Sequence, residues 1–272
     1  SLSMPISREV VHDEIRQRDK TVISRGATIQ GSCSQFSVSN GRSACTAICL
    51  YAASQLLPRM EEAPSSLTSN LIDSCVHLGV ILYQDLTIPE EHTSVYDLWA
   101  TEAFEAIIPS LDRGDTIVGR TSKSDFARCL NDATDFAVSQ GNISIALVIT
   151  KPPETILMMC KDATQGAPWF LFDSHGQQLD QENRAYIVQL DTMACATDAL
   201  MRKFPHVHGL EGESLYAQQL NMFEAHPILL KCHEFKTRPN PPTIKDPRGI
   251  VGDAENQPTR QVFEDTEYFR DV

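Results

Sequence analysis

The 272-residue sequence lacks any apolar run close to the ~20 residues that a membrane-spanning helix needs. It also lacks basic clusters interleaved with aromatic residues, and its formal net charge is −13 at pH 7. We therefore expect neither a nucleic acid nor an anionic membrane as partner, because both attract basic surfaces. The P-loop, GxGxxG after a strand, HExxH and GxSxG are missing as well. These absences give no support to nucleotide binding, zinc-peptidase chemistry or serine-hydrolase chemistry.

Disulfide and metal frameworks are also missing. The eight cysteines are scattered, without a CxxC pair or framework spacing. Several lie inside apolar segments, which predicts reduced thiols in the cytoplasm or nucleus, or in the host cytosol if the protein is a microbial effector. His206-Val207-His208 and Cys232-His233 have no second ligand pair at zinc-finger spacing. We therefore expect no metal and no cofactor.

What is present is the composition of a soluble globular protein, with 42% hydrophobic and 22% charged residues. The length allows one sizeable core or two modest ones. The pattern predicts three segments: a polar N-terminal segment at 1–30, a folded domain at 31–236, and a proline-rich tail at 237–272. We expect a monomer.

The order of predicted elements indicates the fold class. Helical periodicity dominates the first half and strand patterns the second, and this segregation predicts an α+β fold in which a helical part precedes an antiparallel sheet. Helices are predicted at 44–57, 65–79, 94–104, 123–138, 192–204 and 215–223, and strands at 143–150, 155–161, 168–176, 185–190 and 228–235.

Cys45 stands out among the cysteines because of the segment that it begins. A polar loop at 34–43 leads directly into the apolar helix predicted at 44–57, which Pro58 is expected to end. The thiol then lies in the first helical turn, where free N–H groups and the helix dipole favour a thiolate. Gln35, ten residues upstream, offers a side-chain amide for an oxyanion. Cys45 is the candidate nucleophile, and a small core residue is the alternative.

The second informative segment is Phe172-Asp173-Ser174-His175-Gly176, at the end of a predicted strand. Alternate strand residues share a face, so Asp173 and His175 are expected to project together before Gly176 permits a turn. A carboxylate beside an imidazole fixes its tautomer and raises its basicity, as a general base requires. Asp180 and Asp191 remain alternatives for the orienting carboxylate, and a surface pair without a role is the alternative for the motif.

Gln35, Cys45 and His175 follow the chain order of papain-like cysteine peptidases. More narrowly, Gln35…Cys45-Thr46-Ala47-Ile48 with Leu171-Phe172-Asp173-Ser174-His175 resembles the deubiquitinase domain of herpesvirus large tegument proteins and the tegument-like deubiquitinases of non-viral origin, over roughly residues 30–235. The resemblance implies a papain-like fold with Cys45 as nucleophile, Gln35 in the oxyanion hole, and Asp173 and His175 completing the site. It also implies ubiquitin or polyubiquitin chains as partners.

The reaction that this resemblance implies is hydrolysis of the (iso)peptide bond after the C-terminal glycine of ubiquitin, through a thioester. Three alternatives remain: a protease for another ubiquitin-like modifier, a non-catalytic ubiquitin-binding module, and an acyltransferase or deamidase on the same scaffold. Glu102, Glu105 and Asp115 are acidic candidates for contact with the arginine-bearing tail of ubiquitin. Met158 and Met159 either contact an apolar patch of the modifier or, as we prefer, belong to the core.

Overall fold

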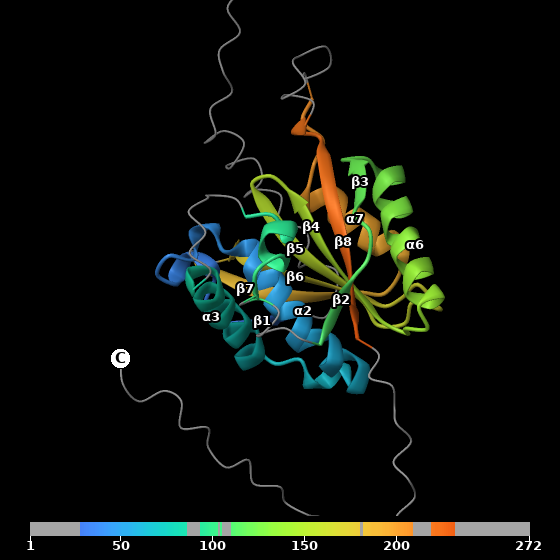
Figure 1. Ribbon diagram of the computed structural model, residues 1–272. Coiled ribbons are helices and arrows are strands. Elements are labelled where there is room, and N and C mark those ends of the chain that lie inside the picture. The colour runs from blue at the N-terminus through green and yellow to red at the C-terminus, as the bar shows by residue number, and fades with distance from the viewer. Residues whose placement is uncertain are drawn as a thin grey trace, which may run out of the picture. The chain divides into compact units, whose positions relative to one another are not determined.

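The computed structural model describes residues 28–85, 93–102, 104, 110–179, 182–208 and 219–231 (Figure 1). All of the described residues belong to one compact unit of the chain, which lies within Ser1–Cys232. The predicted tail at 237–272 and nearly all of the predicted segment at 1–30 lie outside the described residues. Within the described ranges, no helix has both the length and the apolar character needed to cross a bilayer.

One antiparallel sheet organises the described residues. The strands are β1 (Thr28–Gln30), β2 (Leu111–Arg113), β3 (Ile117–Arg120), β4 (Ile145–Lys151), β5 (Glu154–Cys160), β6 (Trp169–Leu179), β7 (Glu182–Leu190) and β8 (Met222–Leu230). They follow the order β1-β7-β6-β5-β4-β8-β2 in the sheet, and β3 also pairs with β8. The predicted hairpin is present: β4 and β5 pair from Ile145 opposite Cys160 to Lys151 opposite Glu154.

Helices cover both faces of this sheet, because its central strands are apolar on both sides. On one face, α2 (Cys45–Glu62), α3 (Ser69–Asp85) and α4 (Val95–Trp99) form a core with Val148, Phe172 and Ile187. On the other, α6 (Lys123–Ser139) and α7 (Met193–Lys203) form a second core with Leu147, Leu171 and Tyr186. Figure 1 shows the two helical layers on opposite sides of the strands. The predicted α+β class is confirmed, although β1, β2 and β3 are interleaved with the helices instead of following them.

Several predicted helix boundaries are wrong. The helix predicted at 65–79 spans Ser69–Asp85 (α3), and the helix predicted at 94–104 is interrupted, because α4 ends at Trp99. The helix α2 continues through Pro58 to Glu62. A proline inside a helix costs about 3 kcal/mol or more, but Leu57 and Met60 on either side are fully buried, and this packing keeps the helix intact. The helix predicted at 215–223 is wrong at its described end, because Met222 and Phe223 begin β8. There the ring of Phe223 stacks on Phe126 with centroids 4.5 Å apart.

Candidate active site

The loop before α2 holds Gln35 in a fully buried position between the loop and β6. Gly41 is required there, since a Cβ at this position would overlap the Gln35 carbonyl oxygen. The Gln35 Nε2 donates to the Arg42 carbonyl at 3.1 Å, and its Oε1 accepts from the Ser174 hydroxyl at 2.7 Å. Both ends of the amide are therefore fixed, and the second hydrogen on Nε2 remains able to donate to another acceptor.

Cys45 is the first residue of α2, in the first turn as the sequence predicts. The N-cap residue is Ala44, which makes no side-chain cap hydrogen bond, so the side chain before Cys45 does not compete for the first-turn amides. The Cys45 residue is 6% exposed. It opens on a small pocket between α2 and the β4–β5 turn, lined by Ser43, Cys45, Thr46, Thr93, Thr150, Pro152, Pro153 and Thr155.

A β-bulge delivers the imidazole to this thiol. The pairing of β6 with β7 shifts register between Asp173 and Gln177, and Gly176 has a positive φ of 79°. A Cβ on Gly176 would lie 2.5 Å from the backbone nitrogen of Arg184, so only glycine fits. The bulge turns His175 toward α2, while Asp173 keeps the orientation of Leu171, toward α7. The strand thus continues past Gly176, where the sequence predicts a turn.

Two hydrogen bonds join Asp173 and His175. The Asp173 Oδ1 lies 2.7 Å from His175 Nδ1 and accepts from the His175 backbone N–H at 2.9 Å. Asp173 is fully buried and His175 is 7% exposed. With Nδ1 held by the carboxylate, Nε2 is the ring nitrogen that faces the thiol.

The thiol and the imidazole form a coupled pair. Burial acts to raise the pKa of Cys45, but the hydrogen bond and charge of His175, and hydrogen bonds from Thr155, lower it below its ordinary value of 9.0. Burial acts to lower the pKa of His175, but the charge and hydrogen bond of Asp173, with the hydrogen bond to Cys45, raise it to about 10. Both shifts favour a thiolate–imidazolium pair, which is the reactive form of a cysteine nucleophile.

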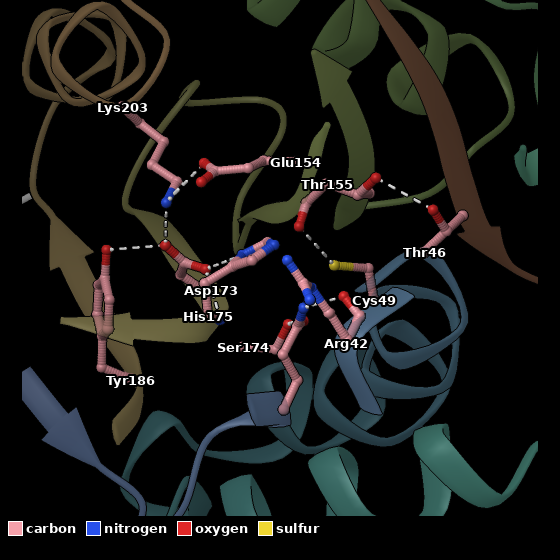
Figure 2. A network of polar contacts seen from close by, with 11 residues as sticks. Arg42, Thr46, Cys49, Glu154, Thr155, Asp173, Ser174, His175, Tyr186 and Lys203 are labelled. Carbon is pink, nitrogen blue, oxygen red and sulfur yellow. Dashed lines mark hydrogen bonds and ion pairs between the residues drawn. The ribbon is translucent and has the colours of Figure 1, made fainter. Parts of the chain in front are cut away.

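A buried cation, not predicted from the sequence, lies behind Asp173. Lys203, the last residue of α7, places its Nζ 2.7 Å from Asp173 Oδ2 and 3.0 Å from Glu154 Oε2. The Tyr186 hydroxyl donates to the same Asp173 oxygen at 3.4 Å. Figure 2 shows Lys203 reaching between the two carboxylates, with His175 on the other side of Asp173. The side chain of Lys203 is only 1% exposed, although a lysine in the last turn of a helix is usually solvated.

The remaining candidates from the sequence lie away from this cluster. Asp191 accepts from Gln189 at an exposed position, and Asp180 lies outside the described residues. Met158 and Met159 are fully buried in the two cores, as preferred. Glu102 and Asp115 are exposed and do not line the pocket, and Glu105 lies outside the described residues.

The histidines considered as metal ligands are engaged otherwise. The His206 ring lies edge-on to His208 at 5.2 Å and within 3.4 Å of Asn221 Nδ2. Among the described residues, no group of three or more His, Cys, Asp or Glu side chains is arranged to hold a metal ion.

No protein-family model and no curated protein matches this sequence. Among solved structures, the chain is similar to a ubiquitin-specific protease encoded by a murine cytomegalovirus tegument protein, solved in complex with a ubiquitin-based suicide substrate. The TM-score is 0.49 and the sequence identity 11%, with 77% of this chain and 89% of that chain covered.

Proposed function

We propose that the protein is a papain-like cysteine peptidase that acts as a deubiquitinase. One observation carries the chemistry: the Cys45 thiol, at the start of a helix and open to a pocket, is hydrogen-bonded to a histidine whose other nitrogen is held by a buried aspartate. A surface Asp–His pair without a role, or a cysteine that only fills the core, would not require a thiol, an imidazole and a carboxylate in contact with one another. Nucleophile, base and orienting carboxylate in one chain of contacts are what covalent acyl transfer requires.

The mechanism follows from the positions of these groups. The Cys45 thiolate attacks the carbonyl carbon of the C-terminal glycine, and the electron pair of the C=O bond moves to oxygen. The backbone N–H of Cys45 and the fixed Gln35 amide donate to this oxyanion. His175 gives its proton to the leaving amine as the C–N bond breaks and leaves a thioester. Water then attacks the thioester while His175 takes its proton, and the C–S bond breaks, which releases the carboxylic acid and restores the thiolate–imidazolium pair.

Ubiquitin is proposed as the substrate on two grounds. The Gln35…Cys45 and Asp173-Ser174-His175 motifs resemble those of the tegument deubiquitinases. The pocket beside the thiol also suits a small acyl residue, because its lining is built of Ser and Thr hydroxyls and two prolines and carries no charge. A glycine enters such a site without placing a side chain against Pro152 or Pro153.

The direct test uses ubiquitin with an electrophile at its C-terminus, with the wild-type protein and Cys45→Ala compared by intact mass spectrometry. We expect a one-to-one covalent adduct on the wild type only. For Gln35→Ala we expect turnover of a fluorogenic ubiquitin substrate to fall by about two to three orders of magnitude, because one oxyanion donor is lost.

Other outcomes would contradict the proposal in distinct ways. Tight binding of unmodified ubiquitin without any adduct would indicate a binding module. An adduct with a different ubiquitin-like modifier but none with ubiquitin would replace the substrate and keep the chemistry. Amine transfer or release of ammonia, with no modifier cleaved, would indicate an acyltransferase or deamidase.

A further inference from the structure

We propose that Lys203 is a positioning residue of the site, which holds Asp173 ionised with one oxygen turned to His175, and that Glu154 is the counter-anion of Lys203. The proposal rests on the proposed cysteine chemistry and adds to it a charge contributed from the opposite face of the sheet. Neither Lys203 nor Glu154 contacts the thiol in the manner of a catalytic residue, so both would act through Asp173.

The geometry divides the Asp173 carboxylate into two halves with different partners. Oδ1 binds the ring and the backbone N–H of His175, and Oδ2 binds Lys203 Nζ at 2.7 Å. A carboxylate bound at both oxygens cannot rotate without breaking one of these contacts. The position of the imidazole is therefore fixed from α7, which packs on the face of the sheet opposite α2.

The charges alternate along this chain of contacts. From the thiolate of Cys45 the order is imidazolium of His175, carboxylate of Asp173, ammonium of Lys203 and carboxylate of Glu154. Burial acts to raise the pKa of Glu154, but the charges of Lys203 and His175, together with the hydrogen bond from Lys203, lower it below its ordinary value, which keeps the second carboxylate ionised too. A buried ion loses several kcal/mol of solvation, so each charge depends on its neighbours.

The groups facing Asp173 and His175 come from four elements. Cys45 and Cys49 belong to α2, Glu154 to β5, Tyr186 to β7 and Lys203 to α7. Among these described groups, Lys203 is the one cation besides the imidazolium. If its charge is removed, two buried carboxylates remain on either side of the vacated position, and one of them takes up a proton. A protonated Asp173 stabilises the imidazolium less, and the thiolate is then formed at higher pH.

The test follows the thiolate directly and needs no ubiquitin. The rate of Cys45 alkylation by iodoacetamide is measured from pH 5 to pH 10 by fragmentation mass spectrometry, in the full chain and in four variants. In Lys203→Met we expect alkylation at pH 7 to slow about tenfold, which corresponds to a pKa of Cys45 about one unit higher. Lys203→Arg is expected to keep the wild-type profile. Glu154→Gln/Lys203→Met, which removes both charges together, is expected to recover most of the loss.

Lys123→Met is the matched control, because Lys123 pairs with Asp198 of the same helix α7 at 2.9 Å but on the surface. It is expected to leave the alkylation profile unchanged. Thermal unfolding checks each variant, and if Lys203→Met does not fold, the arginine variant and the double variant carry the test.

Two results would overturn the positioning role: a Lys203→Met profile that superimposes on the wild type, or a double variant no more reactive than Lys203→Met. A protein that shows the expected shifts but cleaves no ubiquitin retains this role and loses the proposed substrate. If the protein cleaves ubiquitin but Lys203→Met does not shift the pH profile of Cys45 alkylation, the proposed function stands and the positioning role of Lys203 is wrong.

Discussion

Two regions of the molecule bring together the same three functional groups with opposite results. At the first, Cys33 Sγ lies 3.4 Å from Asp73 Oδ1 and 3.6 Å from His77 Nε2. Burial and the adjacent Asp73 raise the pKa of this thiol to about 12. At the second, His175 lies between Cys45 and Asp173, and the pKa of Cys45 is lowered despite the burial that would raise it.

The comparison indicates that the pKa of each thiol depends more on which group contacts it directly than on which groups are present. A carboxylate in direct contact with a thiol repels the thiolate, whereas a carboxylate behind an imidazole stabilises the cation that attracts it. Asp73 is occupied in a different task, since it accepts from the backbone and hydroxyl of Ser32 at 2.7 and 2.8 Å and so ties the end of β1 to α3. The first region is a structural junction with the composition of an active site.

The largest expected contrast is between the two histidines. We expect His175→Ala to lower turnover of a fluorogenic ubiquitin substrate by about 10⁴-fold or more, because base and acid are lost together. His77→Ala, at the exposed counterpart, is expected to change turnover less than about twofold. Equal losses in the two variants would remove the distinction between the regions.

The second contrast is the pH dependence of labelling in the wild type. With a pKa of about 12, Cys33 is about one part in 10⁵ thiolate at pH 7. Its alkylation rate should therefore rise about tenfold per pH unit up to about pH 12, whereas that of Cys45, whose pKa is lowered below 9.0, should be half-maximal below pH 9. At pH 7 we expect Cys45 to react at least about 100-fold faster, as measured by peptide mapping. A Cys33 plateau near neutral pH would contradict this.

The smallest effects are expected when Asp73 and Asp173 are each replaced by asparagine, and the two changes in alkylation rate should have opposite signs. Asp73→Asn removes a negative charge beside Cys33 and should speed its alkylation at pH 9 by about tenfold. Asp173→Asn removes the charge that supports the His175 cation and should slow alkylation of Cys45 at pH 7 by about the same factor. Mass spectrometry of the two peptides decides between these directions, and a change of the same sign at both thiols would refute the explanation.

Local patterns were enough to predict the parts of the site that lie close together in sequence. The loop and helix around Cys45 are encoded within residues 34–57, and the Asp173–His175 pair within three residues. The pairing itself was predicted from regular strand alternation, but the structure produces it through the bulge and the left-handed Gly176. Such a shift in register depends on the neighbouring strand β7, which no local pattern of β6 describes.

Lys203 and Glu154 could not be found from the sequence for a related reason. Lys203 ends an amphipathic helix, where a solvated lysine is common, and Glu154 follows two prolines in a turn, where an exposed acid is common. Only the packing of α7 against the sheet brings them together. The edge strands β1 and β2 were missed because three residues are too few to show a period of two.

The irregular pairing of β6 with β7 has a consequence for engineering. The register shifts by two residues there, so three residues of β6, from Ser174 to Gly176, face the single residue Ala185 of β7, and the direction of the imidazole depends on this surplus. Grafting the Asp173–His175 pair onto another scaffold would therefore require both strands as one piece, because the direction of the histidine is set by the partner strand as much as by its own.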